Sequence, residues 1–226
     1  MTSVLSVLVV AVIIGVLLWL ALVDRGRRGG RLSAEATRLG LHYRPYASLS
    51  ERLRNAHFIL LDCGQFRHFR HLIEGQLADG RYLNLFDYSL ITAHGVSTQT
   101  LLLLPCQLPD QQRFCISRQA WLDEDGFSET LQHPLQSLHK EQRPPRLHQW
   151  QLLSAEPAQL WSLLQPELCD WLLAHPHLHI EWSDGILLLC RPEHLLQPEQ
   201  LEAAIDHARQ LIRLLQRQAG LPAGHD

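Results

Sequence analysis

Lysine is nearly absent from this sequence, and the familiar catalytic motifs are missing. Lys140 is the single lysine among 226 residues, and the five cysteines include no C-x-x-C pair. An odd number of cysteines without that spacing is typical of a reducing compartment, where cysteine serves as a small apolar residue. The sequence also lacks GxxxxGKS/T, GxSxG, HExxH and a strand-bound GxGxxG. The commonest nucleotide-binding and hydrolase sites are therefore excluded.

Positive charge is scarce outside one short segment. Residues 24–31 carry four arginines, whereas the rest of the chain has 16 basic and 22 acidic side chains, a net charge near −6. A protein that binds nucleic acid needs a basic face to neutralise phosphates. The acidic body of this chain therefore argues against a nucleic-acid partner.

A long apolar run occupies residues 4–23. These twenty residues contain no charge and one polar side chain, Ser6. A helix of this length extends about 30 Å, which matches the hydrocarbon core of a bilayer. The pattern predicts a single transmembrane helix, and with it a lipid bilayer as partner of residues 4–23.

A cleavable signal peptide is the alternative interpretation of this run. A signal peptide has a basic n-region, a shorter apolar segment and a small-residue cleavage site. Residues 1–3 carry no basic side chain, and residues 21–23 make a poor cleavage site. The positive-inside rule predicts instead a retained anchor in a bacterial inner membrane, with the N-terminus outside and residues 24–226 in the cytoplasm. Candidate contacts to anionic lipid are Arg25, Arg27, Arg28 and Arg31.

The first part of the remaining chain has the pattern of an antiparallel meander. Two strand-like segments flank Asp79-Gly80, a dipeptide that favours a two-residue hairpin turn and would pair Leu77 with Tyr82. Strands are predicted at 66–77, 81–91, 98–104 and 113–117. Before them, a short helix is predicted at 33–39, and a capping box at Ser48–Glu51 opens a second short helix that runs to about Asn55.

The second part combines another hairpin with a long helix. Asp184-Gly185 has the same turn chemistry, and its register sets Cys190 opposite His179. The helix predicted at 198–218 has an apolar stripe typical of a helix that packs on a sheet. A strand at 147–153 and helices at 157–164 and 166–174 are also predicted.

These elements predict an α+β fold class. An N-terminal single transmembrane helix would be followed by a cytoplasmic domain with an antiparallel β-meander and packed helices. The predicted division is 1–31 for the anchor and its basic flank, 32–143 for the meander half, and 144–226 for the half with the hairpin and the C-terminal helix. Both halves contain a strand, an Asp-Gly turn and a second strand, so an old duplication is an open alternative.

A short part of the meander resembles a known group of proteins. Gly75-x₄-Gly80 is followed by Leu85-Phe86-Asp87-Tyr88, then by Thr98-Gln99-Thr100-Leu101, and then by Leu104-Pro105 or Leu108-Pro109. This G…FDY…TQT stretch resembles a broad group of uncharacterised bacterial single-pass membrane proteins. The resemblance implies a cytoplasmic α+β domain on a membrane helix. It brings no assigned function and no catalytic residues.

Asp87 and Tyr88 stand out as polar residues on a predicted central strand. One interpretation makes Asp87 an acid or base that works with His94 or His71. In the other, Asp87 accepts hydrogen bonds from the backbone or from an arginine, while Tyr88 packs its ring and bonds its hydroxyl. We favour the structural interpretation and keep Asp87 and His94 as the catalytic candidates.

A second cluster consists of His177, His179 and Cys190. On one strand, the two histidines would project to the same face, with the cysteine beside them. Imidazole and thiolate groups are ligands that zinc accepts. With fourteen histidines in the chain such a cluster arises easily, and no fourth ligand is identifiable. We therefore predict no bound metal or other cofactor.

These observations support two functional hypotheses. The favoured one is a non-enzymatic interaction or scaffolding domain at the cytoplasmic face of a bacterial membrane, with a protein partner that the sequence does not identify. The alternative is a membrane-associated enzyme that uses Asp87 with a histidine, or a metal at His177 and His179. The apolar run, the acidic body and the lack of a convergent catalytic set favour the first.

Overall fold

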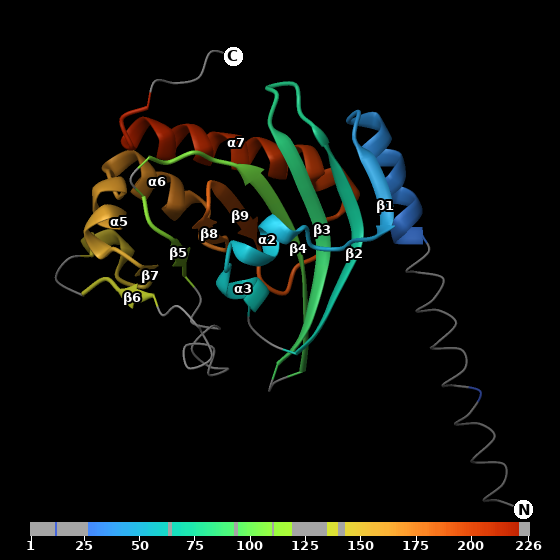
Figure 1. Cartoon of the computed structure of the whole chain (residues 1–226), viewed down its shortest axis with the longest axis horizontal. Helices are drawn as coiled ribbons and strands as arrows, with labels where there is room; N and C mark the ends of the chain where they lie inside the picture. The colour runs from blue at the N-terminus through green and yellow to red at the C-terminus, as the bar shows by residue number, and fades with distance from the viewer. Residues whose placement is uncertain are drawn as a thin grey trace, which may run out of the picture.

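The computed structural model describes residue 12 and residues 27–62, 65–92, 95–109, 111–118, 135–139 and 143–221. Within these ranges the chain forms one nine-stranded antiparallel sheet with helices on both faces (Figure 1). No helix in these ranges combines the length and the apolar character needed to cross a bilayer. The run at 4–23 lies outside the described residues except for Val12.

The strands are β1 (His42–Tyr46), β2 (Gln65–Gln76), β3 (Tyr82–Thr92), β4 (Gly95–Pro105), β5 (Phe114–Ser117), β6 (Gln136–Ser137), β7 (Gln151–Ser154), β8 (His179–Ser183) and β9 (Ile186–Cys190). The α-helices are residues 27–38, which we call helix 27–38, α2 (Glu51–Asn55), α3 (Ile59–Asp62), α5 (Pro157–Leu163), α6 (Pro166–Ala174) and α7 (Leu201–Gln218). Short 3-10 helices are η3 (Pro145–Leu147) and η4 (Pro198–Gln200).

The fold class predicted from the sequence is therefore wrong as stated. The described residues support no N-terminal transmembrane helix, and the strands expected in a meander and a separate hairpin belong to one sheet. Its strand order is β1-β2-β3-β4-β9-β8-β5-β7-β6. The hairpin β8–β9 pairs with β4 on one side and β5 on the other. Hydrophobic periodicity reveals single strands and does not reveal such pairing between distant segments.

The second Asp-Gly dipeptide forms the predicted two-residue turn. Asp184 and Gly185 have φ angles of 49° and 72°, the left-handed values that a type I′ turn requires. The predicted register is confirmed, because His179 pairs with Cys190 across β8 and β9.

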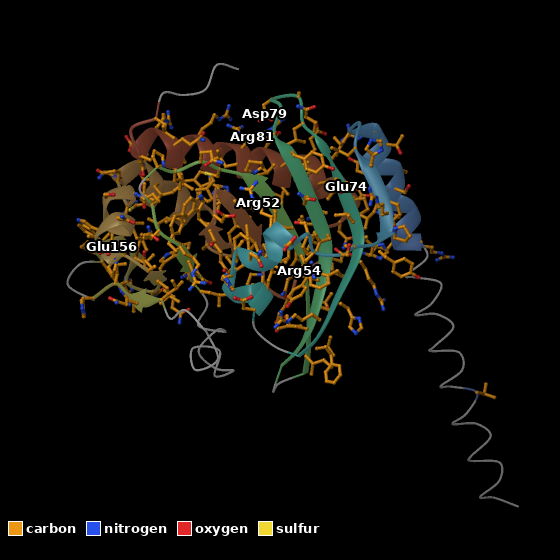
Figure 2. The ribbon with its side chains drawn as sticks, in the orientation of Figure 1. Arg52, Arg54, Glu74, Asp79, Arg81 and Glu156 are labelled. Atoms are coloured by element: carbon orange, nitrogen blue, oxygen red, sulfur yellow. The ribbon has the colours of Figure 1, made fainter. Side chains whose placement is uncertain are left out.

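The first Asp-Gly dipeptide also lies in a hairpin turn, but the register differs from the prediction. Tyr82 pairs with Gln76 rather than with Leu77. Leu77 instead bonds through its backbone to Arg81, so the loop has three residues. Arg81 Nη1 donates to Asp79 Oδ2 at 2.6 Å within this turn (Figure 2). The predicted register of this hairpin was therefore wrong by one residue.

Helices cover both faces of the sheet (Figure 1). Helix 27–38, α5, α6 and α7 contribute to the core on the first face, and α2 and α3 contribute to the core on the second. The predicted apolar stripe of α7 is confirmed, since Leu201, Ile205, Ala208, Leu211, Ile212 and Leu215 are all buried.

The stripe of α7 can be tested by a matched pair of substitutions. Leu211→Ala should lower the free energy of unfolding by about 3 kcal/mol, because it leaves a cavity in the core. Arg213→Ala, at an exposed position of the same helix, should change it little. Urea unfolding followed by circular dichroism measures both, and equal effects would contradict the assigned face.

Candidate binding site

A largely buried ion pair joins helix 27–38 to the middle of strand β3. Arg28 Nε donates to Asp87 Oδ2 at 2.8 Å, and Arg28 Nη2 donates to Oδ1 at 3.0 Å. Thr100, opposite Asp87 on β4, donates its hydroxyl to Oδ1 at 2.6 Å. Asp87 is 6% exposed, so this planar two-point contact is largely removed from water. The arginine expected beside Asp87 is Arg28.

Thr100 extends this network to the segment before α7. Its Oγ1 accepts a hydrogen bond from the Leu196 backbone N–H at 3.0 Å, and its own N–H donates to His194 O at 3.0 Å. The neighbouring Gln99 Oε1 accepts from the Glu193 N–H at 3.3 Å. The network thus connects helix 27–38, strands β3 and β4, and the segment before α7.

His71 lies beside the ion pair but bonds to a different partner. It occupies a β-bulge of β2 with φ 55°, and its Nδ1 lies 2.8 Å from the hydroxyl of Tyr43. Burial lowers the pKa of His71 and outweighs the opposing effect of the Asp87 charge. Burial also raises the pKa of Tyr43, and Asp87 adds to that shift. The other predicted partner of Asp87, His94, lies outside the described residues.

Helix 27–38 approaches the side chains of Tyr43 and His71 closely at Gly29. A Cβ added at Gly29 would lie 2.8 Å from the Tyr43 hydroxyl and 3.4 Å from His71 Cε1. The first distance is too short for real atoms, so a larger residue would require the Tyr43 side chain or the helix to shift. Arg28 thus makes the charged contact with the sheet, and the missing side chain of Gly29 leaves room for Tyr43 and His71 beside it.

A cavity of about 280 Å³ opens on the first face, between α7 and strands β4 and β9. Apolar ligand sites of roughly 150 Å³ accept benzene, and small-molecule sites begin at roughly 300 Å³. Thr100 lies in the wall, so the cavity borders the Arg28–Asp87 network. Its apolar wall includes Leu102, Leu178, Leu189, Leu196, Ala203 and Ala204.

His207 of α7 gives the cavity a titratable group. Its ring centroid lies 4.8 Å from that of His175, which stacks on Trp171 at 4.1 Å. Burial lowers the pKa of His207, the charge of His175 lowers it further, and Asp206 opposes both. The His207 imidazole is therefore predominantly neutral at pH 7, while Arg191 supplies a fixed positive charge at the same cavity.

Another polar cluster is buried on the second face. Glu181 of β8 accepts hydrogen bonds from the backbone N–H groups of Ile59 at 2.6 Å and Leu60 at 3.0 Å, at the start of α3. His179 Nε2 lies 2.7 Å from the same carboxylate, and Cys115 Sγ lies 4.0 Å from His179 Nδ1. Glu181 was not among the predicted site residues, although a charge within an apolar strand was a visible signal.

The order of thiol, imidazole and carboxylate in this cluster has the form of an activated nucleophile. Cys115 and His179 are fully buried, however, and Glu181 is 2% exposed. A substrate would have to enter the core to reach them. We therefore assign Glu181 a structural role, because it bonds N–H groups that the start of a helix otherwise leaves unpaired.

The candidate zinc ligands do not share one strand. His177 lies in the turn before β8, whereas His179 and Cys190 are paired across β8 and β9. His179 is engaged by Glu181. Burial raises the pKa of Cys190 well above its usual range, which disfavours the thiolate that zinc requires. Among the residues that the structure describes, no group of three or more His, Cys, Asp or Glu could hold a metal ion.

The ion pair predicts a large effect for a small substitution. Asp87→Asn should lower the free energy of unfolding by about 2 kcal/mol, because it leaves the largely buried Arg28 guanidinium without its counter-charge. Arg28→Met should cost a similar amount. The double variant should cost little more than either single one, since the two residues act as a unit.

Urea unfolding measures these effects, and Glu199→Gln is the matched control. It removes the exposed ion pair between Glu199 and Arg31, so it should have no measurable effect. Additive losses in the double variant would show that Arg28 and Asp87 stabilise the fold independently. If Asp87→Asn alone abolished a cellular phenotype that Arg28→Met preserved, Asp87 would have a chemical role of its own.

The environment of His207 predicts a pH dependence. Its pKa should lie below the usual 6.5, and His175→Gln should raise it by removing a nearby positive charge. Because the folded-state pKa is the lower one, the free energy of unfolding should fall as the pH drops from 7 towards 5, and less so in His207→Gln. Histidine NMR titration checks the pKa. A value above 6.5 in the native chain would contradict the burial of this ring.

Comparisons with known proteins bear on the fold. No protein-family model matches this chain, and no curated protein matches it. The crystal structure of the mycobacterial trehalose monomycolate transport factor A is similar to it, with a TM-score of 0.56 and 13% sequence identity. The match covers 88% of this chain and 98% of that one. At this identity the likeness establishes a shared fold.

Proposed function

We propose that this chain is a non-enzymatic, membrane-associated factor that assists the transport of an amphiphilic lipid by binding a membrane protein. The observation that carries the proposal is the shared fold with a solved transport factor, over 98% of that chain. The cargo named for that protein is trehalose monomycolate. For this chain we propose only the broader class of an amphiphilic lipid.

The engagement of Asp87 supports a binding role over catalysis. A general base must present an accessible lone pair within reach of its substrate. Both carboxylate oxygens of Asp87 are bonded to Arg28, and one is also bonded to Thr100. Asp87 thus has the surroundings of a residue that holds the fold together.

The proposed membrane contacts follow from the charges that the fold leaves exposed. Arg28 and Arg31 are engaged by Asp87 and Glu199. Arg27 is exposed at the start of helix 27–38. We propose that Arg27, together with Arg25, contacts anionic lipid, and that the apolar residues 4–23 contact the bilayer.

The thiols support a location on the cytoplasmic side of the membrane. Cys106, Cys169 and Cys190 are free cysteines buried in the core. Burial raises the pKa of Cys106 to about 12, so its thiol is unreactive at neutral pH. Unpaired buried cysteines are typical of proteins kept in a reducing compartment.

The cavity supports a second candidate function, direct contact with the lipid. Its mainly apolar wall and its volume of about 280 Å³ suit one short apolar segment. Arg191, His194 and His207 at the same cavity could bond a polar head group. In this version the chain would hold part of the cargo as well as bind a protein.

One purification tests both functions. The full chain, tagged at its C-terminus, is purified in mild detergent from the membranes of its own cells. We expect one membrane protein in stoichiometric amount, with an amphiphilic lipid retained. Ala204→Phe should lose the lipid and keep the protein partner, because the added ring fills the cavity.

The matched control is Arg213→Phe, which adds the same ring at an exposed position of α7 and should keep both partners. Mass spectrometry identifies the protein and the lipid. Absence of any stoichiometric membrane protein from the native chain would refute the proposed function. Equal lipid content in the two phenylalanine variants would refute the role of the cavity.

A further inference from the structure

Three exposed apolar side chains gather where the long strands β2, β3 and β4 end. Phe66 is 69% exposed, Ile91 45% and Val96 70%. Ile91 pairs with both Gln65 and Val96, so the three strand ends are neighbours. We call Phe66, Ile91 and Val96 the strand tip. Figure 1 shows β2, β3 and β4 extending beyond the other strands at this end.

The backbone at Phe66 favours exposure of its ring. Phe66 has φ 51° and belongs to a β-bulge between Gln65 and His68. A positive φ is uncommon for a bulky residue, and bulges redirect side chains at sheet edges. Because this aromatic ring is exposed and does not pack in the core, we interpret it as part of a contact surface.

The charges around the strand tip are positive. Segments 65–71, 88–92 and 95–99 contain no Asp or Glu, although the chain as a whole is acidic. Arg67, next to Phe66, is exposed and donates to the Asp62 carbonyl, and Arg70, opposite Asp87, is exposed farther along β2. Tyr46, which is 79% exposed, pairs with Arg70 at the end of β1. Apolar side chains bordered by tyrosine and arginine are the composition of a protein surface at the bilayer interface.

The first described residues of helix 27–38 lie towards the same end of the sheet. Arg28 bonds Asp87, whereas Leu41, just after helix 27–38, contacts Gly75 near the opposite end of the sheet. Helix 27–38 therefore begins on the side of Asp87 that leads along β3 to Ile91. Ile91 is four positions after Asp87 along β3, a distance of about 13 Å. The apolar run 4–23 precedes this helix in the sequence.

We propose that the strand tip inserts its apolar side chains into the interface of a bilayer that contains anionic lipid. The inference rests on the membrane association in the proposed function and adds a contact made by the folded domain itself. Arg67 and Arg70 would bind lipid phosphates around Phe66, Ile91 and Val96. A bilayer is the chosen partner because the apolar patch is small, because segments 65–71, 88–92 and 95–99 carry no acidic side chain, and because the first described residues of helix 27–38 lie towards the same end of the sheet.

The opposite end of the same strands provides a matched control. Tyr82, at the other end of β3, is 48% exposed, close to the 45% of Ile91. Charged side chains surround that end, since Arg81 pairs with Asp79 and Arg209 of α7 lies 3.1 Å from Asp79. A label there should stay in water whatever the membrane does.

The experiment uses the full chain with Cys63→Ser, and with either Ile91→Cys or Tyr82→Cys labelled with an environment-sensitive NBD dye. Cys106, Cys115, Cys169 and Cys190 are buried, so the introduced thiol is the one labelled. Each protein is reconstituted into vesicles of phosphatidylcholine with phosphatidylglycerol. We expect blue-shifted emission and several-fold stronger quenching by doxyl-labelled lipid for the label at 91 than at 82.

Charge reversal gives the second measurement. Arg67→Glu with Arg70→Glu should reduce lipid quenching at position 91 to the level seen in vesicles of phosphatidylcholine alone. Equal quenching at 91 and 82 would overturn the proposal. So would a label at 91 that is shielded from iodide but not quenched by lipid, because another protein or a second copy would then cover the tip. Tip insertion without a co-purifying membrane protein would leave this inference standing and refute the proposed function.

Discussion

The central strands of the sheet are covered by helices on both faces, and the rest of the structure follows from this constraint. Every residue of β5, β8 and β9 is buried. A polar group in such a strand needs a partner, because burial without a hydrogen bond costs several kcal/mol. In β8 this role falls on covering segments: Glu181 bonds the start of α3, and the Ser183 hydroxyl bonds the carbonyl of Ala56 after α2. The buried polar side chains of β8 thus fix where α3 and the residue after α2 attach to the sheet.

On the first face, Asp87 likewise finds its partner, Arg28, on a helix that packs against the sheet. Removing a carboxylate and a guanidinium from water is expensive, and the cost is offset only when geometry and additional hydrogen bonds are good. The two-point contact and the Thr100 hydroxyl meet that condition. Next to Arg28, Gly29 leaves room for the Tyr43 hydroxyl. Because Thr100 also lines the cavity, the position of helix 27–38 and the shape of the cavity are linked through one side chain.

The two ends of the long strands have opposite character. At the β2–β3 turn, Asp79 and Arg81 pair with each other (Figure 2). At the strand tip, apolar side chains are exposed and the nearby charges are positive. Such polarity along a sheet suits a domain that meets a bilayer at one end and other molecules elsewhere. The proposed transport role and the proposed tip contact both draw on this asymmetry.

Local features of this protein were determined by its sequence alone. The β8–β9 hairpin, with His179 opposite Cys190, followed from Asp184-Gly185, and the buried stripe of α7 followed from its helical period. Both depend on neighbouring residues, so the physical signal is short-ranged. The predicted register of β2 and β3 was wrong by one residue, because Asp-Gly occurs both in two-residue turns and in three-residue loops such as this one.

Tertiary structure alone decided the single sheet and the partners of the buried charges. Strands β4 and β9 are apolar throughout their contact, and nothing in either pattern indicates which strand lies next to which. Arg28 and Asp87 are 59 positions apart, and Glu181 is 122 positions from Ile59. The sequence indicated that Asp87 needed a partner, because a buried carboxylate always does. Which of the arginines could reach it depended on how helix 27–38 packs against the sheet.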